Sequence, residues 1–262
     1  MTRSKVVLAS TSLAQDLGYL ALSDVVSVTT SLNVDYRLVG GHMVSLLVAA
    51  YEVTNAPERE TADADLGASF EVVADTRLPK GLRDLGYKAV AGNRFTRALS
   101  EGSSDELIID ILAPSRTGLH EPNQEAGELV VDAIPGLGYA LAAGPTPLDV
   151  DAVLTTGIEL TVNVLLPSPL AALCLKLLAF NSRYAGKDAL DIWRLLEVAR
   201  AAGVRPSDWP DPAQPRGSRG DALKQLWRFV APGSPGLKQA STDAQTQARI
   251  TALAGTVAPR QP

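Results

Sequence analysis

Two aspartates stand one residue apart in the segment RETADADLG, residues 59–67. If this segment is a β-strand, Asp63 and Asp65 point to the same face, with their α-carbons about 6.6–7 Å apart. Carboxylates held this close repel each other unless something positive lies between them. Their hard oxygens suit Mg²⁺ or Mn²⁺, so the pair is a candidate metal site. An exposed acidic strand, in which acids two residues apart are common, is the alternative.

Other kinds of metal site have too few ligands in this chain. Cys174 is the only cysteine, which excludes an internal disulfide and any metal site built from cysteines. We expect Cys174 to be a small core residue. Because His42 and His120 are the only histidines, a histidine-rich zinc site is not expected either. We expect His42 to be structural and assign no role to His120.

Three further features extend the pattern of the aspartate pair. Gly40 and Gly41 precede an apolar helix, whose first amides and dipole would favour a phosphate close to the backbone. Asp110 lies among apolar strand residues, where it could hold a second metal ion or take the proton of an attacking hydroxyl. Lys176, in an otherwise apolar helix, could reach phosphate oxygens. In combination these residues favour a metal-bound triphosphate as the ligand.

Each of these features also has a plainer explanation, which the sequence leaves open. The glycine pair could be an ordinary turn, and Asp110 could occupy a strand position that faces solvent. Lys176 could extend its ammonium group from an apolar helix face into water.

The elements expected to position these residues follow from apolar periodicity and turn residues. Helices are expected over residues 10–31, 43–51 and 75–85, with a tight turn at Gly40-Gly41. Strands are expected within residues 36–39, 60–71, 87–92, 93–99 and 106–112, and residues 126–142 and 157–168 continue a strand-rich region.

From Ser168 onward the pattern becomes helical. Ser168 suits an N-cap and Pro169 the first helical position, and further helices are expected over residues 187–202, 221–230 and 242–253. We therefore expect an α+β fold with a mixed β-sheet flanked by helices, followed by a helical C-terminal region. The division is expected between a catalytic core, residues 1–167, and the helical region, residues 168–262.

Composition and charge narrow the class of protein. With 46% hydrophobic and 20% charged residues, the chain is expected to be soluble and globular. No apolar run reaches the roughly 18–20 residues that span a bilayer, and we find no signal peptide, so the cytoplasm is expected. Residues 1–202 carry 16 Lys and Arg against 25 Asp and Glu, whereas residues 203–262 carry 8 against 4. This basic part could contact a polyanion or form a solvated helical face.

Three segments in combination resemble a known group of enzymes. They are LVGGHMVSLL, RETADADLG and KLLAFNSRYAGKDALDIWRLL, the last containing a lysine, an arginine and a Lys-Asp-x-x-Asp helix. The pattern resembles the nucleotidyltransferase superfamily with the DNA polymerase β-like core, and more narrowly the AbiEii/MenT-type toxins of type IV toxin–antitoxin systems. The resemblance covers roughly residues 34–200. The turn of that group is often Gly-Ser, and here it is Gly-Gly.

The resemblance implies transfer of a nucleoside monophosphate from a nucleoside triphosphate to an acceptor hydroxyl, with Mg²⁺ or Mn²⁺ as cofactor. It implies a tRNA 3′ end as acceptor and a cognate antitoxin as partner protein. The implied roles fall on two sets of residues: Asp63, Asp65 and Asp110 as catalytic metal ligands, and Gly40, Gly41, Lys176 and Asp191 as nucleotide-binding residues. Asp191 could instead pair with Lys187 or Arg194 at helical spacing.

Two other functions stay open at this point. One is a nucleotidyltransferase with another acceptor: a small molecule, which would require a closed acceptor pocket and no salt-sensitive binding of RNA, or a protein hydroxyl. A non-catalytic relative would bind a partner protein and no nucleotide.

Overall fold

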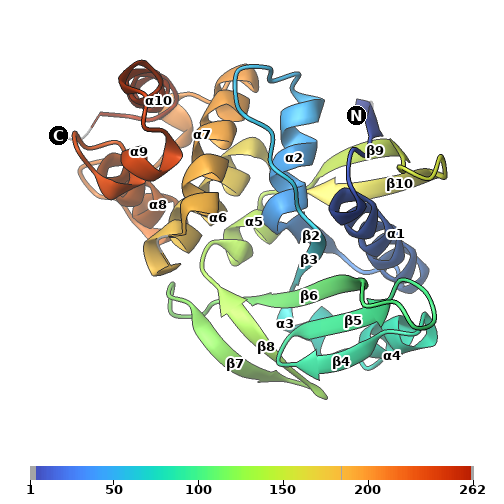
Figure 1. Cartoon of the computed structure of the whole chain (residues 1–262). Coiled ribbons are helices and arrows are strands. Elements are labelled where there is room, and N and C mark those ends of the chain that lie inside the picture. Colours follow the sequence, from blue (N-terminus) through green and yellow to red (C-terminus); the bar gives the residue numbers. More distant parts are fainter. Residues whose placement is uncertain (1–3, 184, 261–262) are drawn as a thin grey trace.

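Two β-sheets with helices packed around them form the computed structural model, which describes residues 4–183 and 185–260 (Figure 1). The strands are β1 (Ser4–Ala9), β2 (Tyr36–Val39), β3 (Asp63–Ala68), β4 (Lys88–Ala91), β5 (Arg94–Ala98), β6 (Glu106–Pro114), β7 (Glu121–Ala126), β8 (Leu129–Ile134), β9 (Thr146–Val153) and β10 (Glu159–Leu166). The smaller sheet has the order β1-β9-β10. The larger sheet has the order β2-β3-β6-β5-β4, and β8 pairs with both β6 and β7.

Helices surround the two sheets and make up the C-terminal part of the chain. They are α1 (Leu13–Leu32), α2 (Gly40–Ala50), α3 (Phe70–Val73), α4 (Arg77–Asp84), α5 (Leu137–Ala142), α6 (Pro169–Arg183), α7 (Gly186–Ala201), the 3₁₀ helix η1 (Pro206–Asp208), α8 (Gly217–Phe229), α9 (Pro235–Ala240) and α10 (Ala244–Val257). Helix α1 packs on β3 and β6, and α2 packs on α7. In Figure 1, α6 to α10 lie together, on the side of the molecule away from α1 and the smaller sheet.

The register at the centre of the larger sheet sets the positions of several polar residues. Strands β3 and β6 run parallel and place Asp65 opposite Asp110. On the flanking strands, β2 places Val39 opposite Asp65, and β5 places Arg94 opposite Asp110. Residues directly opposite each other share a face of the sheet. A row from Val39 to Arg94 therefore crosses four strands on one face.

The alternation of side chains along β6 explains how an acid can sit in an apolar strand. Leu107, Ile109 and Ile111 point to one face and are fully buried, which places them in the main core with α1. Asp110 and Leu112 point to the opposite face, because successive side chains of a strand alternate. The sequence ELIIDILAP thus builds one core face and one face available for a site.

Several sequence predictions are confirmed by these elements. A mixed sheet flanked by helices is followed by a helical C-terminal region, and β2 spans the predicted residues 36–39. The hydroxyl of Ser168 accepts a hydrogen bond from the backbone N–H of Ala171 at 3.4 Å, as expected of an N-cap at the start of α6. The division into two domains at residue 168 stays a prediction.

Other predictions are wrong in ways that matter for the site. The glycine pair is not a turn before a helix, since α2 begins at Gly40 itself. Residues 137–142, expected in a strand-rich region, form the helix α5, and a further helix, α9, was not predicted. Strand β7 was also missed, because its sequence EPNQEA has no apolar alternation. Among the residues that the structure describes, no helix is both long and apolar enough to cross a membrane.

Candidate active site

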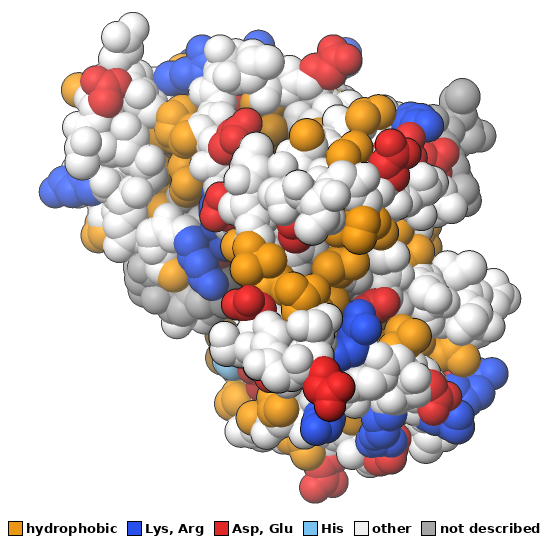
Figure 2. Space-filling model, turned by 45° about the vertical axis from the view of Figure 1, so that its right-hand side comes forward, with side chains coloured by type: hydrophobic (Ala, Val, Ile, Leu, Met, Phe, Trp, Pro, Cys, Tyr) orange, Lys and Arg blue, Asp and Glu red, His pale blue; other side chains and the backbone are white. Residues whose placement is uncertain are grey.

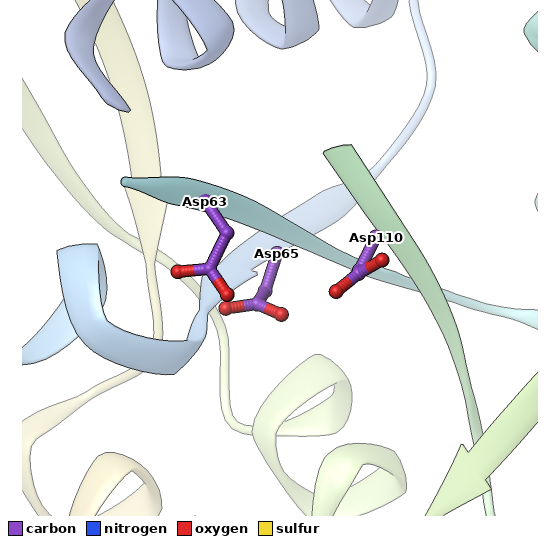
Figure 3. Close-up of side chains that lie close together, drawn as sticks. All are labelled: Asp63, Asp65 and Asp110. Carbon is purple, nitrogen blue, oxygen red and sulfur yellow. The ribbon is translucent and has the colours of Figure 1, made fainter. Parts of the chain in front are cut away.

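Three carboxylates converge on the polar face of the larger sheet (Figure 3). Asp63 and Asp65 come from β3, and Asp110 comes from the neighbouring strand β6. One carboxylate oxygen from each residue lies within 4.8 Å of the others. Asp110 is buried, and the other two are half-buried. Three hard oxygen donors at this spacing fit a divalent cation such as Mg²⁺ or Mn²⁺.

The charge state of Asp63 is set by its neighbours. Its Oδ1 accepts a hydrogen bond from the Thr61 hydroxyl at 2.8 Å. Burial raises the pKa of Asp63, but the hydrogen bonds from Thr61 and the backbone, together with the charge of Lys187, leave that pKa below its ordinary value. Asp63 is therefore ionised at neutral pH, as a metal ligand must be.

Arg94 offsets part of the negative charge of the three carboxylates. Its Nε donates to Oδ1 of Asp110 at 2.9 Å, and its Nη2 donates to Oδ2 at 2.7 Å. These hydrogen bonds raise the pKa of Arg94, to which the charges of Asp63 and Asp65 also contribute. A bidentate pair of this kind holds the carboxylate in one orientation.

We expect Arg94→Gln to tighten Mn²⁺ binding by about tenfold, because the guanidinium both engages the Asp110 oxygens and repels a cation. Titration calorimetry with Mn²⁺ measures the change. Arg97→Gln is the matched control, since Arg97 lies on the same strand but pairs with Asp24. Unchanged or weaker Mn²⁺ binding by the Arg94 variant would contradict this account.

The glycine pair brings the start of α2 against the carboxylates. Gly40 has a φ of +69°, and a β-carbon added to it would lie 1.7 Å from Oδ2 of Asp65. A β-carbon on Gly41 would lie 2.5 Å from the hydroxyl oxygen of Thr61. Only glycine accommodates both the backbone angle and this close approach at position 40. The N-terminus of the 11-residue helix α2 consequently lies against Asp65, and Gly40 and Gly41 line the same cavity as the three aspartates.

The carboxylates line a cavity of about 420 Å³. Of the residues singled out from the sequence, six line it: Gly40, Gly41, Asp63, Asp65, Asp110 and Lys176. Arg59 and Lys187 add two further cations to the lining. The cavity thus brings anionic and cationic groups together around one space. The side chain of Arg183, the arginine of the third segment, lies outside the described residues.

Asp191 is placed differently from its prediction, because it lies behind the cavity lining. Its side chain is fully buried, with Oδ2 2.8 Å from Nζ of Lys176 and 2.9 Å from Nη1 of Arg59. Arg194 lies one turn along α7, with its Nη1 3.5 Å from Oδ1 of Asp191. Lys176 is also 3.4 Å from Asp188. Asp191 therefore holds two cations that reach the cavity, and its pairing with Arg194 matches the alternative left open by the sequence.

His42, in the first turn of α2, is buried and uncharged. Burial lowers the pKa of His42 to about 4, with Asp63 raising it and Arg59 lowering it. The ring lies 5.6 Å from that of Tyr19, measured between centroids. A β-carbon on Gly18 would lie 2.4 Å from its Nε2. A packed neutral ring agrees with the structural role expected for His42.

Besides its apolar residues, the cavity lining includes four polar residues to which no role was assigned from the sequence. They are Asn93, Arg94, His120 and Asp132. Arg94 carried one usable signal, because it stands in a short strand next to the strand with Asp110. Asn93 lies in the turn between β4 and β5. Asp132 depends on the pairing of β8 with β6, and His120 on the loop before β7, which no local pattern indicated.

Comparisons with known proteins leave the family open. No protein-family model matches this chain, and no curated protein matches it. One solved structure with some similarity is the lincosamide antibiotic adenylyltransferase LnuA with lincomycin bound, at 19% identity and a TM-score of 0.38, covering 68% of this chain and 96% of LnuA. Another is the antibiotic-resistance factor ANT(2'')-Ia, at 14% identity and a TM-score of 0.33, covering 89% of this chain and 88% of that factor. At these TM-scores and identities, the overlaps do not place the chain in a family.

Proposed function

We propose that this protein is a metal-dependent nucleotidyltransferase, which moves a nucleoside monophosphate from a nucleoside triphosphate to an acceptor hydroxyl. The observation that carries the proposal is the convergence of Asp63, Asp65 and Asp110 within 4.8 Å beside the N-terminus of α2. A cluster of carboxylates alone would not distinguish a metal site from an ordinary acidic surface. Here they share a cavity with helix amides and with cations, which are the groups that bind phosphate.

The residues divide into a metal-holding side and a phosphate-holding side. Asp63, Asp65 and Asp110 would hold Mg²⁺ or Mn²⁺, which supplies neutralisation of charge on the phosphates when bound. The backbone at Gly40 and Gly41 would approach the phosphates directly. The cations of the lining apart from Arg94, which are Arg59, Lys176 and Lys187, would bind the remaining phosphate oxygens.

The transfer itself requires little covalent chemistry from the protein. The acceptor oxygen attacks the α-phosphorus and forms a new P–O bond, while the bond to the β-phosphate oxygen breaks and pyrophosphate leaves with the electron pair. The acceptor proton passes to a base. Catalysis then comes mainly from positioning the in-line geometry and from stabilising charge.

The identity of the acceptor molecule is a separate question within the proposal. A tRNA 3′ end, a toxin role and a cognate antitoxin follow from the resemblance alone and stay predictions. RNA contact would depend on residues 203–262, which carry 8 Lys and Arg against 4 Asp and Glu. On the face shown in Figure 2, basic side chains are interspersed with acidic ones, and this face offers an RNA backbone no continuous basic stripe.

A small-molecule acceptor is the second candidate, supported by the walls of the cavity. Seven apolar residues line it in addition to the charged ones: Val39, Met43, Leu112, Ile134, Pro135, Leu175 and Ala179. A volume of about 420 Å³ is within the range of small-ligand sites. An apolar wall next to a phosphate-binding side would suit a compact hydroxyl-bearing molecule.

The experiment that tests the function uses purified protein, Mg²⁺ and each nucleoside triphosphate radiolabelled at the α-phosphate. One set of reactions contains total tRNA and another contains a small-molecule extract of cells. Label in tRNA that decreases with added salt would support the RNA acceptor, and label in a small molecule would support the second candidate. If no triphosphate binds in the presence of Mg²⁺ or Mn²⁺, the proposal is wrong and a partner-binding role becomes the better explanation.

A further inference from the structure

A histidine–aspartate pair lines the same cavity on the side away from β3. His120 lies just before β7, and its Nε2 is 3.4 Å from Oδ2 of Asp132 on β8. The other oxygen of Asp132 accepts a hydrogen bond from the backbone N–H of Asn123 at 3.2 Å. The His120 side chain is 41% exposed, so the ring is accessible while one of its nitrogens is held.

The register of the sheet places this pair near the three carboxylates. Strand β8 runs parallel to the end of β6 and sets Asp132 opposite Leu112. Leu112 is two residues after Asp110 on the same face, so the α-carbons of Asp110 and Asp132 are about 8 Å apart. An acceptor molecule over Leu112 would therefore lie between the metal-holding carboxylates and His120.

The loop that carries His120 is organised by its own hydrogen bonds. The carboxylate of Glu121 accepts a hydrogen bond from the backbone N–H of Arg116 at 2.8 Å. The hydroxyl of Ser115 accepts one from the N–H of Gly118 at 3.0 Å. These contacts fix the turn before His120, which gives the ring a defined place at the cavity.

The other groups of the cavity are poorly suited to accept a proton from the acceptor hydroxyl. Asp63 and Asp65 would be committed to the metal, and both oxygens of Asp110 already accept hydrogen bonds from Arg94. The remaining charged side chains of the lining, apart from Asp132, are the cations Arg59, Arg94, Lys176 and Lys187. Among the described lining residues, His120 is the one histidine, and an imidazole nitrogen is the group that most often serves as a general base.

We propose that His120 is the base that accepts the proton of the acceptor hydroxyl, and that Asp132 is the positioning residue that orients its ring. The inference rests on the proposed function and adds a residue to it. As the acceptor oxygen bonds to the α-phosphorus and pyrophosphate leaves, the hydroxyl proton moves to Nδ1 of His120. Asp132 accepts from Nε2–H throughout, which stabilises the charged ring, and the proton is later released to water.

The positioning role can be tested without any acceptor, by nitrogen NMR of isotope-labelled histidine. The chain has only two histidines, so the spectrum is simple. At a pH where the ring is neutral, we expect His120 to carry its proton on Nε2, and we expect Asp132→Asn to mix the two tautomers. Asp84→Asn is the control, because Asp84 pairs with Lys80 on the surface. A mixed tautomer in the parent protein would overturn the role of Asp132.

The same spectra test whether His120 faces the reacting phosphate. Mg²⁺ with the α,β-methylene analogue of each nucleoside triphosphate is added in turn, and binding is followed in parallel by calorimetry. We expect the analogue that binds to shift the His120 resonances. Binding that leaves those resonances unmoved overturns the role of His120 and leaves nucleotide binding intact. Binding of no analogue contradicts the proposed function itself, and this inference falls with it.

The catalytic role is measured with H120Q in the labelled-triphosphate assay, with total tRNA and the small-molecule extract as acceptors. We expect transfer to fall by about 10²–10⁴-fold, which is what a general base ordinarily contributes. The dissociation constant for the triphosphate should stay within about twofold, because the phosphate side of the cavity is unchanged. Transfer by H120Q at the parent rate would overturn His120 as the base.

Discussion

Replacing both Asp63 and Asp65 with asparagine is expected to lower nucleotidyl transfer by about 10³-fold or more. The two side chains supply two of the three carboxylates that converge within 4.8 Å. Without them Mg²⁺ has no anionic cage, and the several kcal/mol of charge stabilisation that a metal gives the transition state is lost. Calorimetry with Mn²⁺ and the labelled-triphosphate assay measure the two parts of this effect separately.

The fold of this double variant is expected to survive, which makes the result interpretable. Asparagine has the shape of aspartate, and its side-chain oxygen can still accept the hydrogen bond that the Thr61 hydroxyl donates to Asp63. Because the pKa of Asp63 lies below its ordinary value, its charge is stabilised in the fold, so the midpoint of urea unfolding should fall slightly while the protein stays folded. Glu106→Gln is the matched control, since Glu106 is an exposed acid at the start of β6. Full transfer by the double variant would remove these aspartates from the catalytic machinery.

The part of the site that the sequence predicts is the part built by short segments. RETADADLG sets two aspartates on one face because a strand alternates its side chains, and the β3 register confirms it. The glycine pair was predicted to bring the backbone close to a ligand, and position 40 has the positive φ that glycine favours. Lys176 was notable as a charge among the leucines of an otherwise apolar helical segment, and it lines the cavity. Each of these sequence patterns is contained in a segment of about ten consecutive residues.

The part that the sequence does not predict is assembled by long-range pairing. Asp132 reaches the cavity because β8 pairs with the end of β6, which no local pattern specifies. His120 immediately precedes the polar strand β7, and the sequence of that strand has no apolar alternation by which it could be predicted. Asp191 was expected to line the site, yet it packs under Lys176 and Arg59. Whether a charged residue faces a cavity or supports another charge depends on how helices pack, and helical spacing alone cannot decide it.

The buried ion pairs of Asp191 make a second strong prediction, this time for stability. Asp191→Asn keeps the shape of the side chain but removes the one negative charge that Lys176, Arg59 and Arg194 share. Breaking a buried pair in this way leaves uncompensated charge and costs about 3–5 kcal/mol. Burial already lowers the pKa of Arg194, which shows that the charged form is held at some cost even with Asp191 present.

We therefore expect the free energy of unfolding of Asp191→Asn to fall by about 3–5 kcal/mol in urea titrations. Asp84→Asn serves as control, because the Lys80–Asp84 pair is exposed and its loss should leave the transition where it is. Where the variant remains folded, Arg59 loses its ion pair with Asp191, and Lys176 keeps Asp188 at 3.4 Å but loses the closer carboxylate at 2.8 Å. Triphosphate affinity should therefore fall as well. A variant as stable as the parent that also binds triphosphate equally well would mean that neither cation depends on Asp191. Loss of stability with unchanged triphosphate affinity would mean that Asp191 serves only the packing of α6 against α7. Loss of both stability and triphosphate affinity would mean that Asp191 also positions the cations that bind phosphate.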